Sequence, residues 1–161
     1  MSHPDSESDD SNSIDIPGYR QSDSYSCGFV AGLMVLHHFY PRRSLSKFYE
    51  EVSPDEEFGT ETNQLRSALV RSKVKVMKKH SLSFADVERH INNGKPILTC
   101  IDSGPHEHWI AIYGFSKENR SVYIAGNNLP YIAKLFHSHE VKWADLRKIL
   151  RPKDSVLICS I

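Results

Sequence analysis

The spacing of apolar residues changes along the chain, from helical in the first half to strand-like in the second. Between Cys27 and Tyr40, apolar residues occupy more than one face of the predicted helix, and a helix that is apolar all round is usually buried. The helix should end near Tyr40, because the residue before a proline is pushed out of the helical region. The pattern therefore predicts a buried central helix that begins at Cys27.

Two amphipathic helices are predicted after the central one. Ser44 is a suitable N-cap for a short helix over residues 45–52. Gly59-Thr60 opens the next helix, in which Leu65 and Leu69 recur at the spacing of one helical face. Both helices present an apolar face that can pack against the central helix.

Turn residues and short β-branched runs dominate the rest of the chain. Ser83 followed by Asp86 resembles a capping box, and Asn92-Asn93-Gly94 should end that helix. Alternation and β-branched or aromatic composition predict strands at 74–76, 97–101, 109–115, 122–125 and 156–159, with a polar helix near 143–150. Helices first and an antiparallel meander afterwards indicate an α+β fold.

The N-terminal residues 1–13 differ in composition from the remainder. They are rich in Ser, Asp and Glu and contain no aromatic residue, Lys or Arg, so they offer little apolar surface to offset the entropy of ordering. We therefore expect a flexible acidic tail over 1–13 and one domain over 14–161. A chain of 161 residues with 39% hydrophobic residues is large enough for one packed core.

Charge and cysteine content narrow the possible partners and the setting. The 20 basic and 20 acidic residues cancel, which gives no electrostatic reason to expect nucleic acid or an anionic membrane as partner. Three cysteines do not suggest a disulfide framework. With no apolar signal segment, we expect a cytoplasmic protein, or one exported by a dedicated secretion system without a classical signal peptide.

Cys27 is the strongest candidate for chemistry. The N-terminus of a helix offers unpaired N–H groups and partial positive charge, which favour the nucleophilic thiolate. Gln21, six residues earlier, supplies an amide that can donate to an oxyanion, together with a backbone N–H near the nucleophile. The alternative is that Cys27 is a small buried apolar residue, as expected for Cys100 and Cys159 in their strand patterns.

A cysteine nucleophile needs a base that a third group orients. His108 begins the strand run that ends at Gly114, where an imidazole is held rigidly yet remains reachable. Asn127 or Asn128, after the neighbouring strand, can accept from the imidazole and fix its tautomer. Each residue has an ordinary structural reading, but the ordered set Gln, Cys, His, Asn favours a catalytic site.

A zinc site built from His106, His108, Glu107, His137 and His139 is a further alternative, although Cys-x-x-Cys and His-Glu-x-x-His motifs are absent.

These motifs together resemble the double-glycine leader peptidases of bacteriocin transporters and their stand-alone relatives among the papain-like cysteine peptidases. The resemblance rests on Gln21 with Cys27-Gly28, on Gly59-Thr60, on Asn93-Gly94-Lys95-Pro96-Ile97, and on His108-Trp109 followed by alternating apolar residues. It implies a papain-like fold, in which a helical part with the buried cysteine helix packs against a C-terminal antiparallel sheet. It also implies Gln21 as oxyanion donor, Cys27 as nucleophile and His108 as base. The Asp-Pro pair of these relatives is replaced by Gly126-Asn127.

The leading hypothesis is a thiol-dependent hydrolase that acts on amide bonds of a peptide or protein and needs no cofactor or metal. Catalytic residues would be Gln21, Cys27, His108 and Asn127. A deamidase or acyltransferase, as in papain-like effectors and toxins, shares the attack step and remains open. A catalytically inactive binding domain of the same fold is the third reading.

Overall fold

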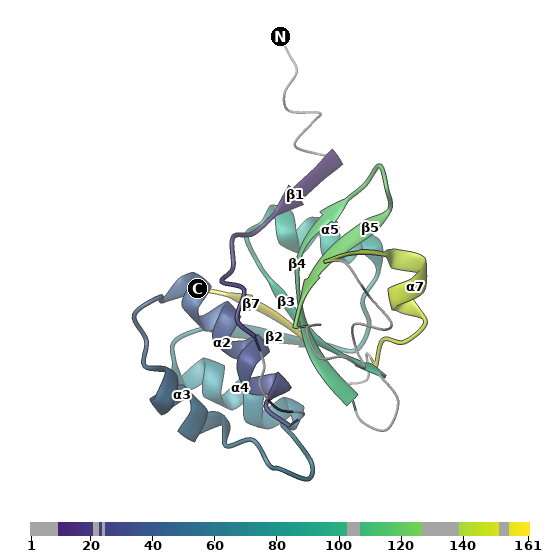
Figure 1. The fold of residues 1–161 in the computed structure, drawn as a ribbon. Coiled ribbons are helices and arrows are strands. Elements are labelled where there is room, and N and C mark those ends of the chain that lie inside the picture. The colour runs from purple at the N-terminus through teal and green to yellow at the C-terminus, as the bar shows by residue number, and fades with distance from the viewer. Residues whose placement is uncertain (1–9, 21–22, 24, 103–106, 127–138, 152–154) are drawn as a thin grey trace.

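A computed structural model describes residues 10–20, 23, 25–102, 107–126, 139–151 and 155–161. Three helices form one end of the molecule, and an antiparallel sheet with two further helices forms the other (Figure 1). The helices are α2 (Cys27–Phe39), α3 (Leu45–Val52), α4 (Thr62–Arg71), α5 (Phe84–Asn92) and α7 (Trp143–Arg147). The strands are β1 (Ser11–Ser13), β2 (Lys75–Lys79), β3 (Ile97–Asp102), β4 (Glu107–Ser116), β5 (Ser121–Ala125), β6 (Glu140–Lys142) and β7 (Val156–Ser160).

Helix α2 is the buried centre of the helical part, as its all-round apolar pattern predicts. Every residue from Cys27 to Leu36 is buried. Gly32 lets neighbouring side chains approach closely, because a Cβ there would lie 2.6 Å from Leu65 Cδ1 and 3.3 Å from Phe48 Cζ. The helical part therefore packs around α2 at a distance that only glycine permits.

The short helices begin at the predicted caps. Lys47 N–H donates to Ser44 Oγ at 3.2 Å, and Ser83 with Asp86 forms the reciprocal capping box of α5. Helix α4 begins at Thr62, two residues after the predicted start, because Glu61 and Gln64 form a capping box there. Gly94, with φ of 73°, follows the end of α5 as predicted.

The described strands form a seven-stranded antiparallel sheet in the order β2-β7-β3-β4-β5-β6, with β1 paired to β4 beside that path. Strands β3 to β5 form the predicted meander, and β6 extends it. The C-terminal strand β7 lies between β2 and β3, where Val76 pairs with Cys159 and Ile97 with Ile158. The pattern did not predict this insertion, nor the short strands β1 and β6.

The two faces of the sheet carry different cores. On β4, Trp109 and Ala111 pack in the cluster that contains α2, while Ile110 and Ile112 pack in the cluster that contains α5 and α7 residues. This period-two division follows from the alternation of side chains along a strand. The start of β4 is thereby brought against the helical part.

The segment from Ser11 to Tyr19, which we call the strap, runs from the sheet to α2 (Figure 1). Ile14 N–H donates to the Tyr113 carbonyl at 2.7 Å, and His38 Nδ1 donates to the Asp15 carbonyl at 2.7 Å. The Tyr19 hydroxyl donates to His37 Nδ1 at 2.6 Å. Residues 11–13, expected in the flexible tail, are thus ordered as β1, while residues 1–9 lie outside the described part.

Replacement of Leu65 by Ala should lower the free energy of unfolding by about 3 kcal/mol, because Leu65 is fully buried where α4 meets α2. Val70→Ala on the same helix should cost only about 0.5 kcal/mol, since Val70 is 48% exposed. Urea denaturation followed by far-UV circular dichroism measures both. Equal losses would contradict the packing described for α2 and α4.

Candidate active site

Cys27 is the first residue of α2, and the chain enters the helix through a turn built on Asp23. The Asp23 carboxylate accepts from the N–H groups of Tyr25 at 3.1 Å and Ser26 at 2.8 Å. Ser26 is the N-cap residue but makes no side-chain cap bond. The turn therefore fixes where the Cys27 side chain leaves the helix.

The sulfur of Cys27 meets the start of β4. The backbone N–H groups of Trp109, Gly28 and Cys27 itself lie near it and act to lower its pKa. Because the Trp109 nitrogen belongs to the peptide group that joins it to His108, the sulfur lies beside the His108–Trp109 peptide. Folding thus brings together two residues that are 81 positions apart in the sequence.

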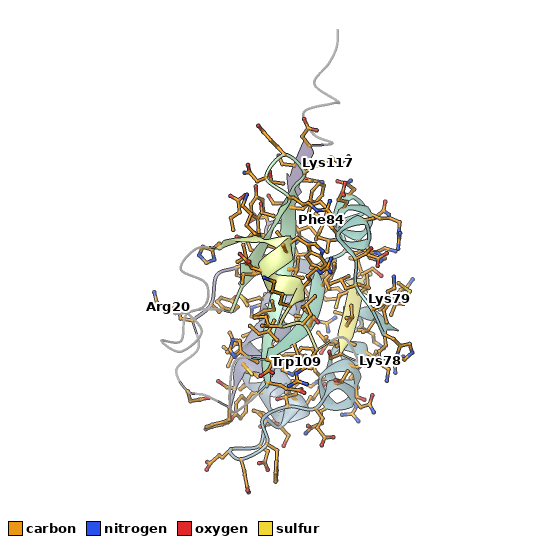
Figure 2. The ribbon with its side chains drawn as sticks, turned by 90° about the vertical axis from the view of Figure 1, so that its right-hand side faces the viewer. Arg20, Lys78, Lys79, Phe84, Trp109 and Lys117 are labelled. Atoms are coloured by element: carbon orange, nitrogen blue, oxygen red, sulfur yellow. The ribbon has the colours of Figure 1, made fainter. Side chains whose placement is uncertain are left out.

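Two further contacts hold this junction. The indole N–H of Trp109 donates to the Thr60 carbonyl at 2.9 Å, and Trp109 lies where the sheet meets the helical part (Figure 2). A Cβ at Gly28 would lie 2.8 Å from Thr60 Cβ and 3.0 Å from Trp109 Cδ1. Gly28 and Thr60, predicted only as parts of motifs, are therefore the residues that allow α2 and β4 to approach.

His108 is the second residue of β4 and pairs with Ile101 of β3. Its Nε2 donates to the Gly126 carbonyl at the end of β5. This bond assigns the proton to Nε2 in the neutral ring and leaves Nδ1 as the proton acceptor. Burial lowers the pKa of His108, and the bond to Gly126 opposes this only in part. The ring is thus held neutral in the tautomer that a base requires.

The thiol is also held in its neutral form. Burial raises the pKa of Cys27 above its ordinary value, and the nearby N–H groups of Trp109, Gly28 and Cys27 offset only part of that rise. The N–H groups at the helix N-terminus lower the pKa, as expected, but burial has the larger effect, so the net shift is upward. Desolvation of a side chain that is only 5% exposed outweighs the helix terminus.

Other predicted site residues fall outside the described part of the chain. They are Gln21, Asn127 and Asn128, together with His106 and His137 of the zinc alternative. Within the described ranges, no group of three His, Cys, Asp or Glu side chains is placed to hold a metal ion. His139 Nδ1 there donates to the Ile124 carbonyl at 3.0 Å.

The Gly126 carbonyl is the partner of His108 that the sequence did not reveal. A main-chain oxygen accepts from the ring, while the side chains that we expected to do so, those of Asn127 or Asn128, lie outside the described residues. Gly126 has a φ of 98°, in the region that favours glycine, and a Cβ there would lie 3.3 Å from the Trp109 carbonyl oxygen. The only signal in the sequence was the glycine at the end of β5.

Cys100 and Cys159 behave as the apolar residues that the strand pattern predicted. Both are buried free thiols. Burial raises the pKa of Cys159 to about 12 and that of Cys100 well above its ordinary value. Cys27 is therefore the one described thiol that lies at a helix terminus against a histidine-bearing strand. Among the described helices, none has the length and apolar character that a membrane span needs.

Solved structures with the same fold give the site its context. The peptidase domain of Streptococcus ComA, a bifunctional ABC transporter involved in quorum sensing, matches with a TM-score of 0.68 at 11% identity, over 91% of this chain and 98% of that one. A C39-like peptidase from Bacillus anthracis matches with a TM-score of 0.70 at 12% identity, over 94% and 98%. A double-glycine motif protease of an AMS/PCAT transporter, solved with its leader peptide, matches with 0.65 at 13% identity, over 92% and 93%.

At such low identity these structures establish the α+β, papain-like fold and no more. A comparison with curated protein sequences finds no match. The model of the Peptidase_C39 like family, however, matches residues 13–145, which include most of the strap, the Cys27 helix and the His108 strand. The chain therefore belongs to the Peptidase_C39 like family of cysteine peptidase-like proteins.

Proposed function

We propose that this protein is a thiol-dependent hydrolase of amide bonds in a peptide or protein, with Cys27 as nucleophile and His108 as general base. The observation that carries the proposal is the contact between the Cys27 sulfur and the backbone N–H of Trp109. This contact sets the thiol beside the residue that bears the imidazole. The tautomer of His108, with its proton on Nε2, supports the role of base.

The pKa directions favour attack from a neutral pair. As the sulfur forms a bond to the substrate carbonyl carbon, Nδ1 of His108 takes the thiol proton, so thiolate and imidazolium form only during the reaction. The Gly126 carbonyl, already bonded to Nε2–H, stabilises the imidazolium. His108 then returns the proton to the leaving amine, and water releases the acyl group from Cys27.

The negative oxygen of the tetrahedral intermediate needs two donors. The backbone N–H of Cys27 at the N-terminus of α2 supplies one, and the amide of Gln21 supplies the other. Asn127, which follows Gly126 in the sequence, is proposed to help orient the His108 ring. Both side-chain roles rest on the sequence motif, which places Gln21 six residues before Cys27.

A peptide is the substrate class that the family and its structures support. The AMS/PCAT protease was solved in complex with a leader peptide, and we infer that this chain also accepts an extended peptide. Deamidation and acyl transfer share the same first steps and differ in what leaves or attacks afterwards. A mass difference of about one dalton without chain cleavage would identify deamidation of a glutamine or asparagine side chain.

Cys27→Ala should abolish cleavage of a peptide library by removing the nucleophile. His108→Gln should lower kcat by about 10²-fold to 10⁴-fold by removing the base. Mass spectrometry of new peptide termini measures both, with Cys159→Ala, on a strand that pairs with β2, and His80→Gln as controls away from the Cys27–Trp109 contact. Retained turnover in Cys27→Ala would overturn the proposal, and folding of each variant is checked by circular dichroism.

The rate of Cys27 alkylation should report the neutral thiol. Because burial raises the thiol pKa, the rate with iodoacetamide should rise about tenfold per pH unit through the neutral range and continue beyond the ordinary thiol range. Cys100 and Cys159 are buried and should not react in the folded protein, so Cys27→Ala serves as the blank. A rate that reaches its plateau below pH 7 would indicate a resting thiolate–imidazolium pair and contradict the neutral-pair mechanism.

Gln21→Ala should lower kcat by about 10²-fold to 10³-fold with little change in KM, because an oxyanion donor acts on the transition state more than on the bound substrate. Gln21→Glu should be at least as poor, since a carboxylate cannot donate and repels the oxyanion. Steady-state kinetics on the best cleaved peptide measures the effects on kcat and on KM separately. A rise in KM at unchanged kcat would assign Gln21 to substrate binding instead.

A further inference from the structure

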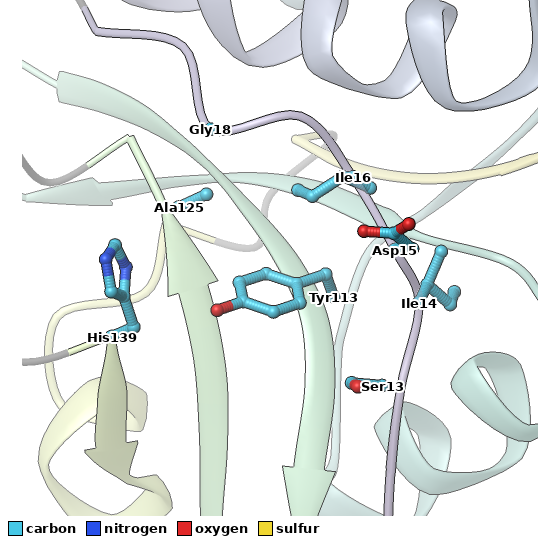
Figure 3. Close-up of a pocket in the computed structure, with 8 residues that line it drawn as sticks. All are labelled: Ser13, Ile14, Asp15, Ile16, Gly18, Tyr113, Ala125 and His139. Atoms are coloured by element: carbon cyan, nitrogen blue, oxygen red, sulfur yellow. The ribbon is translucent and has the colours of Figure 1, made fainter.

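A pocket lies between the strap and the sheet, and Cys27 is not among the residues that line it. Its volume is about 530 Å³. The strap contributes five of the lining residues and the sheet side three, namely Ser13, Ile14, Asp15, Ile16, Gly18, Tyr113, Ala125 and His139 (Figure 3). None of the lining residues described is Lys or Arg, and Asp15 is the one with a formal charge.

This pocket adjoins the proposed catalytic residues along β5. Ala125, in its wall, directly precedes Gly126, whose carbonyl accepts from His108. An extended peptide advances about 3.3–3.6 Å per residue, so a substrate that runs past the end of β5 can place one of its side chains in this pocket. The pocket is therefore placed to receive a side chain of a substrate held at Cys27.

The polar groups of the pocket accept hydrogen bonds and attract positive charge. The Asp15 carboxylate is exposed and has no hydrogen bond or ion pair with any described residue, because only its main-chain carbonyl is used, by His38. Figure 3 shows this carboxylate and the Tyr113 ring directed into the same space. His139, which donates through Nδ1 to the Ile124 carbonyl, keeps Nε2 as an acceptor in its neutral form.

The remaining walls suit an aliphatic stem. Ile16 and Ala125 supply apolar surface beside the Tyr113 ring, which is half-buried. Burial raises the pKa of Tyr113, so its hydroxyl stays protonated and adds no second anion. An aromatic face also attracts an ammonium or guanidinium group. Carboxylate, ring and apolar wall together match the long basic side chains, in which a charged end follows a chain of methylene groups.

We propose that this pocket binds a Lys or Arg side chain of the peptide substrate, a few residues from the bond that Cys27 attacks, and that Asp15 determines this preference. The inference rests on the proposed function, because it names the substrate class of the same site. It assigns the strap a direct part in substrate selection.

The test compares cleavage of peptides that differ at one position. A basic residue is placed at each position in turn on both sides of the cleavage site, and each basic peptide is compared with a neutral one of similar shape. Norleucine replaces Lys, and citrulline replaces Arg. Wild type should prefer the basic peptide at one position, and Asp15→Asn should reduce that preference about fivefold to tenfold while leaving turnover of the norleucine peptide unchanged. Asp15→Lys should shift the preference at that position to Glu. Glu118→Gln, which removes an exposed carboxylate in the turn between β4 and β5, should behave as wild type.

Cleavage with no basic preference at any position, or a preference that Asp15→Asn leaves intact, would overturn the pocket assignment while the peptidase proposal stands. Peptide binding to Cys27→Ala tests the pocket independently of cleavage. If no peptide is cleaved, calorimetry of this variant with the Lys and norleucine peptides still reads the pocket, since Asp15→Asn in the same background should weaken only the Lys peptide. Equal affinities for the two peptides would reject the inference.

Discussion

The close approach of α2 to β4 is the constraint on which the rest of the site depends. It is possible only because position 28 is glycine, since any Cβ there would meet both Thr60 and Trp109 below contact distance. The bond from the Trp109 indole to the Thr60 carbonyl then fixes the third element of the junction. The packing of α2, β4 and residue 60 against one another positions the sulfur of Cys27 next to the peptide group before Trp109.

The same packing sets the electrostatics of the proposed pair. Water is largely excluded from both groups, with Cys27 at 5% exposure and His108 at 1%, so the separated charges of a thiolate and an imidazolium lose their hydration. A neutral pair avoids that cost until a substrate is bound. In the proposed mechanism, catalysis depends on donors and acceptors that are already in position, such as the Gly126 carbonyl on the ring, and the thiolate forms only during the reaction.

The sequence predicted features that local chemistry decides and missed those that distant pairing decides. Caps at Ser44 and Ser83 act within one helical turn, so their helices could be placed from neighbouring residues alone. The insertion of β7 between β2 and β3 depends on strands that are far away along the chain. The residue pattern of a single strand does not identify the strand that pairs with it.

The site divides in the same way. Cys27 and His108 were chosen because their side chains have reactive groups, and the junction brings their backbones together. The Gly126 carbonyl was missed because every residue has a main-chain carbonyl. The identity of a residue therefore does not show which carbonyl accepts a hydrogen bond. The neutral state of the thiol was also missed, because helix position is visible in the sequence whereas depth of burial is not.

In the strap, the atoms that attach the segment to the fold differ from those that face the proposed substrate pocket. Its attachment uses main-chain atoms, namely the ladder of β1 with β4, the Ile14 N–H and the Asp15 carbonyl. Such bonds form with almost any residue, so they leave the side chains at Ser13 and Asp15 without a structural task. Structures at 11–13% identity share the fold, which requires only the backbone of such a segment. A side chain that the fold does not use can change the substrate preference without changing the scaffold, and Asp15, in the wall of the pocket that adjoins β5, is in that position.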